Sequence, residues 1–184
     1  MVEDYNEIDL NKFMDYYDSH KTGIYALFLK EPKGLHFFGI KNLEIMKLIQ
    51  TKMIKCDSMH HIGPLLYIGK TERSIKSRIR EHFSLTPKST LRRTIASLMG
   101  FQSIKTLCNN KLSYDVDEQS NLIITNWLKK YSYFKIYETN MAKKMEEEYI
   151  AKYQPPLNIE DCDNGQLTTL LSNCRKVFKN NIKK

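Results

Sequence analysis

Two short stretches of the chain carry side chains that could handle a phosphate group. The first is LLYIGKT, residues 65–71, followed at once by SIKSRIREHF, which contains Arg78 and His82. Residues four apart lie on one face of a helix, so Arg78 and His82 are expected along the same edge. A solvated arginine beside a half-buried histidine is the commoner reason for such a pair. Chemistry is therefore inferred only if further polar groups converge there.

The second stretch is NMAKKMEEEYIAKYQ, residues 140–154, which is predicted to be helical until Pro155-Pro156 ends it. Its inward face is defined by Ala142, Met145, Tyr149, Ile150 and Tyr153. Glu146 falls inside this arc, whereas Glu147 and Glu148 fall outside it. An inward carboxylate costs free energy unless it is paired or binds a metal. Glu146 is therefore a candidate ligand for a hard cation such as Mg²⁺, and the Asn158 amide could reach the same pocket.

These groups together describe a phosphodiesterase site. The Arg78 guanidinium can stabilise charge that develops on phosphorus. The Tyr67 phenol has an ordinary pKa of about 10, so it needs a cationic neighbour or metal-activated water to act as a base. Gly69 removes a side chain where the backbone must pass close to another group. An inward Glu146 would place the cation against a phosphate oxygen.

The same residues resemble the motifs of the GIY-YIG nucleases. Gly23-Ile24-Tyr25 and Tyr67-Ile68-Gly69 reproduce the two name-giving tripeptides letter for letter. The step from Ile75 to Arg78 is similar to the arginine helix of the family. Glu146, with Asn158 twelve residues later, is similar to its metal-binding glutamate and its asparagine. The resemblance runs from residue 23 to residue 158 and rests on four motifs in order, where either tripeptide alone would be weak.

The resemblance implies a small mixed β-sheet flanked by helices and the hydrolysis of DNA with one divalent metal ion, Mg²⁺ or Mn²⁺. By position it assigns the paired tyrosines, Tyr25 and Tyr67, the transition-state arginine, Arg78, the metal ligand, Glu146, a nearby amide, Asn158, and the structural glycines Gly23 and Gly69. His82 matches a histidine of the restriction-enzyme branch, and Lys70 matches a lysine that some members carry. STLRR and PPLN are similar to stand-alone bacterial members.

The order of predicted elements indicates an α+β fold. Strands are expected at residues 23–30, 65–71 and 131–139, and helices at 10–17, 43–53, 74–83, 89–100, 117–131, 140–154 and 167–184. Ser74 is expected to cap the helix that carries Arg78. We predict one domain over residues 1–184, with a core at about 21–160, a long insertion at 31–64 between the motif strands and a basic C-terminal helix at 165–184.

A net charge of +8 favours an anionic partner, nucleic acid before a membrane surface. In the predicted helix 89–100, Leu91, Ile95 and Leu98 face inward, which leaves Arg92 and Arg93 toward solvent. These two arginines, with Arg80, Lys76 and the lysines of the tail, are expected to contact DNA phosphates.

The four cysteines are scattered and form no C-x-x-C pair. The N-terminus has no signal pattern, and no apolar run approaches the ~20 residues of a membrane span. We therefore expect a cytoplasmic protein, bacterial or phage, with no membrane association and no small-molecule cofactor. Cys56, His60 and His61 could ligate zinc, but they lack a clear fourth ligand, so this alternative is weak.

Two alternatives to an active nuclease stay open at this point. One is a DNA-binding module that keeps the fold and has lost the chemistry. The other is a protein-interaction module, which only the basic tail supports. A homodimer is also possible, because cutting both strands together would need two sites. The apolar stripe of Leu43, Met46, Ile49 and Met53 in the insertion could form its contact, although it could equally pack on its own sheet.

Overall fold

The computed structural model describes residues 6–8, 21–31, 35, 39, 42–84, 86–163 and 165–182, and the predicted helix at 10–17 lies outside them. The described elements are β1 (Asn6–Ile8), β2 (Gly23–Leu29), α2 (Leu43–His60), β3 (Leu65–Thr71), α3 (Ile75–Ser84), η2 (Thr86–Lys88), α4 (Thr90–Leu98), β4 (Ile104–Cys108), β5 (Lys111–Asp115), α5 (Glu118–Tyr131), β6 (Ser132–Glu138), α6 (Ala142–Tyr153) and α7 (Gln166–Asn180). None of the described helices is long and apolar enough to cross a bilayer.

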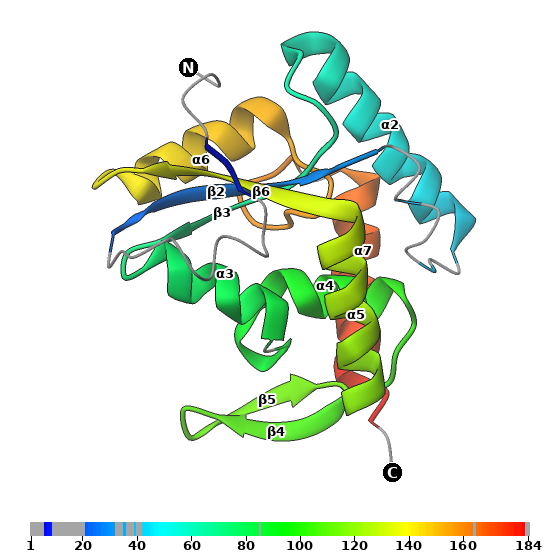
Figure 1. Cartoon of the computed structure of the whole chain (residues 1–184). Coiled ribbons are helices and arrows are strands. Elements are labelled where there is room, and N and C mark those ends of the chain that lie inside the picture. Colours follow the sequence, from blue (N-terminus) through cyan, green and yellow to red (C-terminus); the bar gives the residue numbers. More distant parts are fainter. Residues whose placement is uncertain are drawn as a thin grey trace.

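A four-stranded sheet in the order β1-β6-β2-β3 forms the centre of the fold (Figure 1). The predicted α+β class is confirmed. Each described strand pair of this sheet is antiparallel, where a mixed sheet was expected. The register sets Tyr25 of β2 opposite Gly69 of β3 on one side and opposite Ile136 of β6 on the other. The two tripeptide motifs are therefore neighbours across one strand pair, with β3 at the edge of the sheet.

Alternate residues of β2 pack into two different hydrophobic layers, as the two faces of a strand require. Tyr25, Leu27 and Leu29 lie in the larger cluster, which includes residues of α3, α4, α5 and α7. Ala26 and Phe28 lie in a smaller cluster with residues of α6. Figure 1 shows α6 on one face of the sheet and α3 and α4 on the other. The edge strand β3 is the place where groups from both layers can meet.

The insertion between the motif strands contains α2, an 18-residue helix. Asn42 caps its start by accepting hydrogen bonds from the backbone of Glu44 and Ile45. Its buried face packs in the core of its own chain, in contact with β3 and α7. Ile49 and Met53 are buried there, whereas Leu43 is exposed. The apolar stripe is thus used within the fold, and it offers no argument for a dimer contact.

A two-stranded hairpin, β4–β5, was missed by the sequence analysis. Its turn residues Asn109 and Asn110 have φ values of 52° and 58°, in the left-handed region. Consecutive positive φ values are typical of the tight turns that join hairpin strands, and asparagine tolerates them well. The Asn-Asn pair between two short β-prone runs was the available signal.

The solvent-facing position predicted for Arg92 is wrong, because its side chain is fully buried at 0% exposure. Its guanidinium makes five hydrogen bonds, to Thr86 Oγ1, the His82 carbonyl, Thr125 Oγ1 and both the carbonyl and Oδ1 of Asn121. These acceptors come from α3, η2 and α5, which cover this side of α4. Burial lowers the pKa of Arg92 to about 10, so it stays charged at neutral pH. Arg92 is a structural clamp and is unavailable to DNA.

Candidate active site

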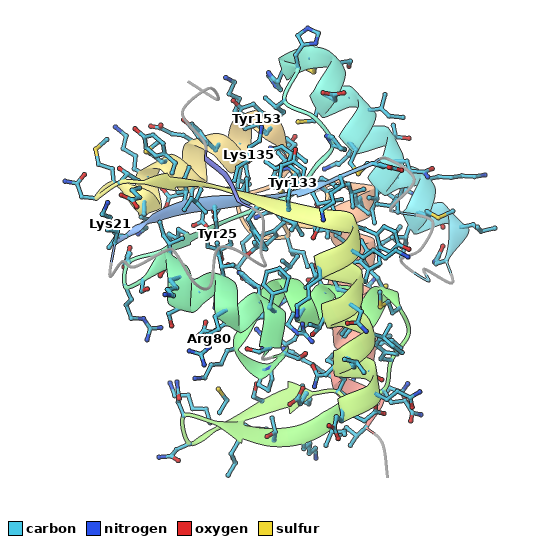
Figure 2. The ribbon with its side chains drawn as sticks, in the orientation of Figure 1. Lys21, Tyr25, Arg80, Tyr133, Lys135 and Tyr153 are labelled. Atoms are coloured by element: carbon cyan, nitrogen blue, oxygen red, sulfur yellow. The ribbon has the colours of Figure 1, made fainter. Side chains whose placement is uncertain are left out.

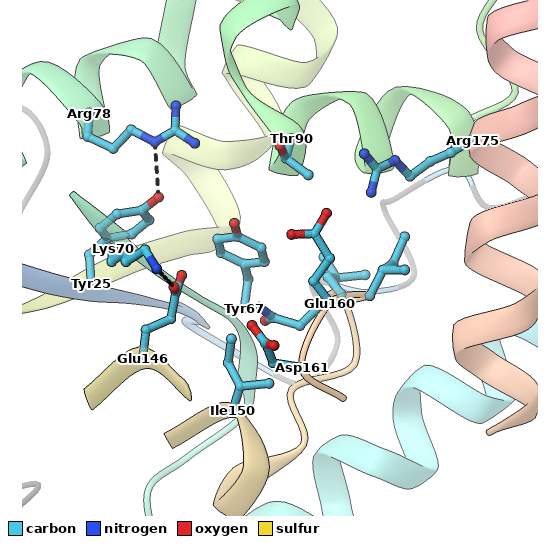
Figure 3. Close-up of a pocket in the computed structure, with 13 residues that line it drawn as sticks. Tyr25, Tyr67, Lys70, Arg78, Thr90, Glu146, Ile150, Glu160, Asp161 and Arg175 are labelled. Atoms are coloured by element: carbon cyan, nitrogen blue, oxygen red, sulfur yellow. Dashed lines mark hydrogen bonds and ion pairs between the residues drawn. The ribbon is translucent and has the colours of Figure 1, made fainter. Parts of the chain in front are cut away.

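A cavity of about 260 Å³ lies beside β3, and six of the seven residues predicted to be catalytic or metal-binding line it (Figure 3). Its lining includes Tyr25, Tyr67, Lys70, Arg78, Glu146 and Asn158. These residues come from β2, β3, α3, α6 and the segment that follows α6. The structure therefore brings together groups that are up to 133 positions apart in the sequence, from Tyr25 to Asn158.

The Tyr25 hydroxyl makes polar contacts with both Arg78 and His82. Arg78 donates to it from Nε at 3.2 Å, and Nε2 of His82 lies 2.8 Å from it. The tyrosine ring can cross β3 because its partner in the register is a glycine. A Cβ on Gly69 would lie 2.5 Å from the Tyr25 oxygen and 2.6 Å from Cζ. Gly69 is thus required by the ring of Tyr25, which gives a physical reason for pairing the two motifs.

His82 is fully buried between Tyr25 and Ser89. Its Nδ1 lies 2.6 Å from Ser89 Oγ, and the same oxygen caps α4 by accepting the Arg92 N–H at 3.0 Å. Burial lowers the pKa of His82 well below its ordinary value, and the charges of Arg78 and Arg92 act in the same direction. The imidazole is therefore neutral, and Ser89 and Tyr25 hold one ring nitrogen each.

The Arg78 guanidinium is held by three contacts. Besides Nε to Tyr25, Nη1 donates to Glu81 at 2.9 Å and to the Lys88 carbonyl at 2.8 Å. Burial disfavours its charge, but Tyr25 and Glu81 outweigh that effect and raise the pKa of Arg78 above its ordinary value. In the described ranges, Nη2 makes no hydrogen bond, so the guanidinium, which lines the cavity, keeps donors unused.

Glu146 points into the cavity from α6 as predicted, and Glu147 and Glu148 are exposed. It pairs with Lys70 at 3.0 Å, and the two side chains are only 14% and 29% exposed. Burial raises the pKa of Glu146, although Lys70 opposes this change. Burial would lower the pKa of Lys70, but the hydrogen bond and charge of Glu146 outweigh it, so the pKa is raised. The pair places a carboxylate and an ammonium together below Tyr25.

Asn158 lines the cavity, but its amide is used by the backbone of β3. Its Oδ1 accepts the N–H of Ile68 at 2.9 Å, and its Nδ2 donates to the carbonyl of Ile68 at 2.8 Å. The next bond is Leu157 N–H to the Leu66 carbonyl, at 2.9 Å. The amide thus continues the pairing of the free edge of β3 on either side of Tyr67.

Burial raises the pKa of Tyr67 well above its ordinary value, and Tyr25 adds to this rise.

A profile of the GIY-YIG catalytic domain matches residues 23–177. The chain belongs to the GIY-YIG family. Membership implies nuclease activity, and nucleases of this family typically depend on a divalent metal. Among curated proteins and solved structures, none matches the chain significantly. The matched region includes both tripeptides, Arg78, Glu146 and Asn158, and it continues through most of α7.

The GIY-YIG site also contains residues that the sequence analysis missed. Thr90 at the start of α4, Glu160 and Asp161 after α6, and Arg175 of α7 line the same cavity (Figure 3). The two acids lie only two and three positions beyond Asn158, and that short spacing was a usable signal. No signal in the sequence pointed to Arg175, because the packing of α7 against α4 brings it to the cavity.

The donors around Glu146 fit a divalent cation. Mg²⁺ takes one or two carboxylates and completes its shell with water and phosphate oxygens, and the cavity offers Glu146 with Asp161 on its rim. In the part of the chain that the structure describes, no cluster of three His, Cys, Asp or Glu side chains could hold a metal ion. The zinc alternative is therefore not supported. Cys56 is buried in the core, and the His60 ring packs edge-on against Tyr153.

The residues predicted to contact DNA differ in exposure. Arg80 is exposed and lies on the side of α3 away from the sheet (Figure 2), and Lys76 is partly exposed. On α7, Lys176 and Lys179 are exposed, whereas Lys183 and Lys184 lie outside the described residues. Arg93 is only partly exposed, and its Nη2 donates to Thr90 Oγ1 at 3.3 Å. The solvent-facing position predicted for Arg93 is therefore observed only in part.

Proposed function

We propose that this GIY-YIG protein is a DNA endonuclease that hydrolyses phosphodiester bonds with one divalent metal ion. One observation carries the proposal. The buried Tyr25 hydroxyl contacts both Arg78 Nε and His82 Nε2, inside a cavity that also receives the Glu146 carboxylate. A packed core gains nothing from this set of groups, whereas attack of water on a phosphodiester uses each of them.

Tyr25 is proposed to take the proton of the attacking water. In its phenolate form the oxygen would be stabilised by the N–H of Arg78 and by an N–H at Nε2 of His82. The Ser89 hydroxyl already accepts the Arg92 N–H, and its own proton is suited to Nδ1, which assigns the ring proton to Nε2. Burial and two cationic neighbours make His82 a poor proton acceptor, so its role is that of a neutral donor.

Arg78 is proposed to stabilise the charge that develops on the phosphorus oxygens. Its Nε and Nη1 are fixed by protein acceptors, so the guanidinium needs little reorganisation when substrate binds. Preorganised donors of this kind are effective because their orientation is set before the reaction. The unused Nη2 edge is the part that would donate to a phosphate oxygen.

Glu146 is proposed to hold the divalent ion, with Asp161 on the rim of the same cavity. When bound, the ion would polarise the phosphate and stabilise the leaving oxygen. Lys70 now neutralises Glu146, and it would stay close enough to contact a phosphate oxygen once the cation takes the carboxylate. Asn158 acts through the backbone, because it holds the strand that carries Tyr67.

The test is cleavage of supercoiled plasmid by the purified protein with Mg²⁺, with Mn²⁺ and with chelator. The critical variant is Glu146→Gln, which keeps the shape and removes the charge. Its matched control is Glu147→Gln, which removes the same charge from the adjacent, exposed position of α6. We expect metal-dependent cleavage by the parent, a loss of at least ~10²-fold in Glu146→Gln and an unchanged rate in Glu147→Gln.

Two results would contradict the proposal. Equal cleavage by the parent and Glu146→Gln would show that the site is wrongly placed. No cleavage of supercoiled, linear or branched DNA by the parent, together with retained DNA binding, would instead indicate the inactive DNA-binding module.

A further inference from the structure

At the end of the cavity away from Lys70 and Glu146, one arginine has no partner, and a second arginine near it is only partly satisfied. Arg175 reaches the lining from α7, and Figure 3 shows its guanidinium directed toward Thr90 and Glu160. It is only partly exposed, and in the described part of the chain it makes no hydrogen bond or ion pair. Arg93 lies outside the lining and donates from Nη2 to Thr90 Oγ1, but its buried Nε has no partner. A guanidinium that lines a cavity without an acceptor is suited to bind an anion.

The charges at this end are mutually unfavourable. Burial lowers the pKa of Arg93, and the charges of Arg175 and Arg78 lower it further. The charges of Arg78 on α3 and Arg175 on α7 thus both act on the guanidinium of Arg93 on α4. Glu160 faces the same side but is exposed and not within ion-pair distance of Arg175. Of these three guanidinium groups, Arg78 is paired with Glu81, whereas those of Arg93 and Arg175 have no carboxylate partner in the described part of the chain.

We infer that Arg175 and Arg93, with the Thr90 hydroxyl, form a second phosphate-binding subsite for the backbone of the same DNA strand. This inference rests on the proposed function, because it takes the end with Tyr25, Arg78 and Glu146 to bind the scissile phosphate. A guanidinium presents a planar set of donors that matches phosphate oxygens. Tyr67 lies between the two ends in Figure 3, so a strand across it would present a neighbouring phosphate to Arg175.

The subsite makes the substrate a polynucleotide rather than an isolated phosphodiester. A dinucleotide or an aryl ester of a nucleotide offers only the scissile phosphate. A longer strand also fills the second subsite and neutralises Arg175 and Arg93. Arg175 is thus a positioning residue. Its loss should raise KM and leave kcat nearly unchanged, because it makes the same contact before and during the chemical step.

The first experiment compares three charge variants on a DNA duplex that contains one mapped cleavage position. Arg175→Gln should raise KM by about tenfold and lower the log–log salt slope by about one. Lys129→Gln removes the same charge from an exposed position of α5 and should change KM by less than about twofold. Glu160→Gln should lower KM, since it removes an acid beside the subsite. If Arg175 only formed a structural ion pair with Glu160, Arg175→Gln and Glu160→Gln would lower the stability of the fold by similar amounts. The two variants would then not change KM in opposite directions.

The second experiment replaces single phosphates on each side of the cleavage position by uncharged methylphosphonates. At one flanking position, the replacement should raise the KM of the parent about tenfold. The same replacement should raise the KM of Arg175→Gln almost no further. A purely structural role of Arg175 cannot produce that position-specific coupling. Equal losses in parent and variant at every position would overturn the inference. If the parent cuts no DNA, the proposed function fails, and the same coupling measured in Kd then tests the subsite separately.

Discussion

The two ends of the cavity differ in how their polar groups are satisfied. At the end with Tyr25, protein partners hold the phenol, Lys70 pairs with Glu146, and two of the three nitrogens of Arg78 are fixed. At the other end, Arg175 has no partner among the described residues, and the nearby Arg93 bonds to Thr90 but keeps a buried Nε without a partner. The comparison separates two tasks. The chemical groups are preorganised by the fold, whereas the far end is completed by the substrate.

The largest effect is expected at the clamp behind the preorganised end. Arg92→Met should lower the free energy of unfolding by at least about 3 kcal/mol, because several buried acceptors lose their donor and each such loss costs about 1–3 kcal/mol. Urea unfolding followed by circular dichroism measures it. Arg93→Met is the control from the adjacent position, and it should cost less than about 1 kcal/mol. Equal losses in the two variants would contradict the clamp.

The next effect is on the chemical step. Arg78→Lys keeps one charge but loses the planar donors, so it can no longer serve Tyr25, Lys88 and a phosphate together. We expect kcat to fall by about 10²–10³, with a much smaller change in KM. Single-turnover cleavage of the mapped duplex measures the chemical step directly. Arg73→Lys, at an exposed position before α3, should leave the rate unchanged. If Arg78→Lys raises KM with kcat intact, Arg78 belongs functionally with Arg175.

The pH dependence should identify the proton acceptor. Burial raises the pKa of Tyr25 above its ordinary value of about 10, with Arg78 opposing the rise. The phenolate fraction, and with it the single-turnover rate, should therefore still rise between pH 7 and pH 9. Glu146 must lose its proton to bind the cation. Its raised pKa therefore shifts the acid limb of the pH–rate profile to higher pH. Tyr25→Phe should abolish the alkaline rise, and a variant that keeps the rise would exclude Tyr25 as the base.

The preorganised end was much easier to predict from the sequence than the far end. Tyr25, Tyr67 and Arg78 lie in short motifs, and Glu146 follows from helical periodicity, since an acid in an apolar arc is visible without a structure. The Ser74 cap is likewise local, and the structure places its hydroxyl 3.2 Å from the Ser77 nitrogen.

The sequence could not predict contacts that only the packing of distant elements creates. Arg92 appeared to face solvent because the periodicity of one helix does not show that α5 and η2 cover its other side. Asn158 was expected to act through its amide in the cavity, yet the free edge of β3 takes both amide groups. Arg175 reached the site through the packing of α7 on α4. Such contacts are long-range, and no spacing in the sequence encodes them.

The smallest effect concerns His82, which the preorganised end keeps neutral. In the folded state its pKa is far below the ordinary value of about 6.5. Below pH 6.5 the unfolded chain therefore binds a proton at this histidine, whereas the folded chain does not. Stability is unaffected above pH 6.5 and falls as the pH drops below it, by up to about 1.4 kcal/mol per pH unit. The raised pKa of Glu146 acts in the opposite sense, so only a comparison of variants isolates His82.

His82→Gln should therefore lose part of the acid destabilisation between pH 6.5 and pH 5, although it is less stable than the parent at pH 7. Urea unfolding at several pH values gives the slope for each protein. His60→Gln, from the partly exposed histidine at the end of α2, should keep the slope of the parent. If His82→Gln keeps the full slope, the folded protein tolerates an imidazolium at this position. His82 could then accept a proton from Tyr25, and its assignment as a neutral donor would be wrong.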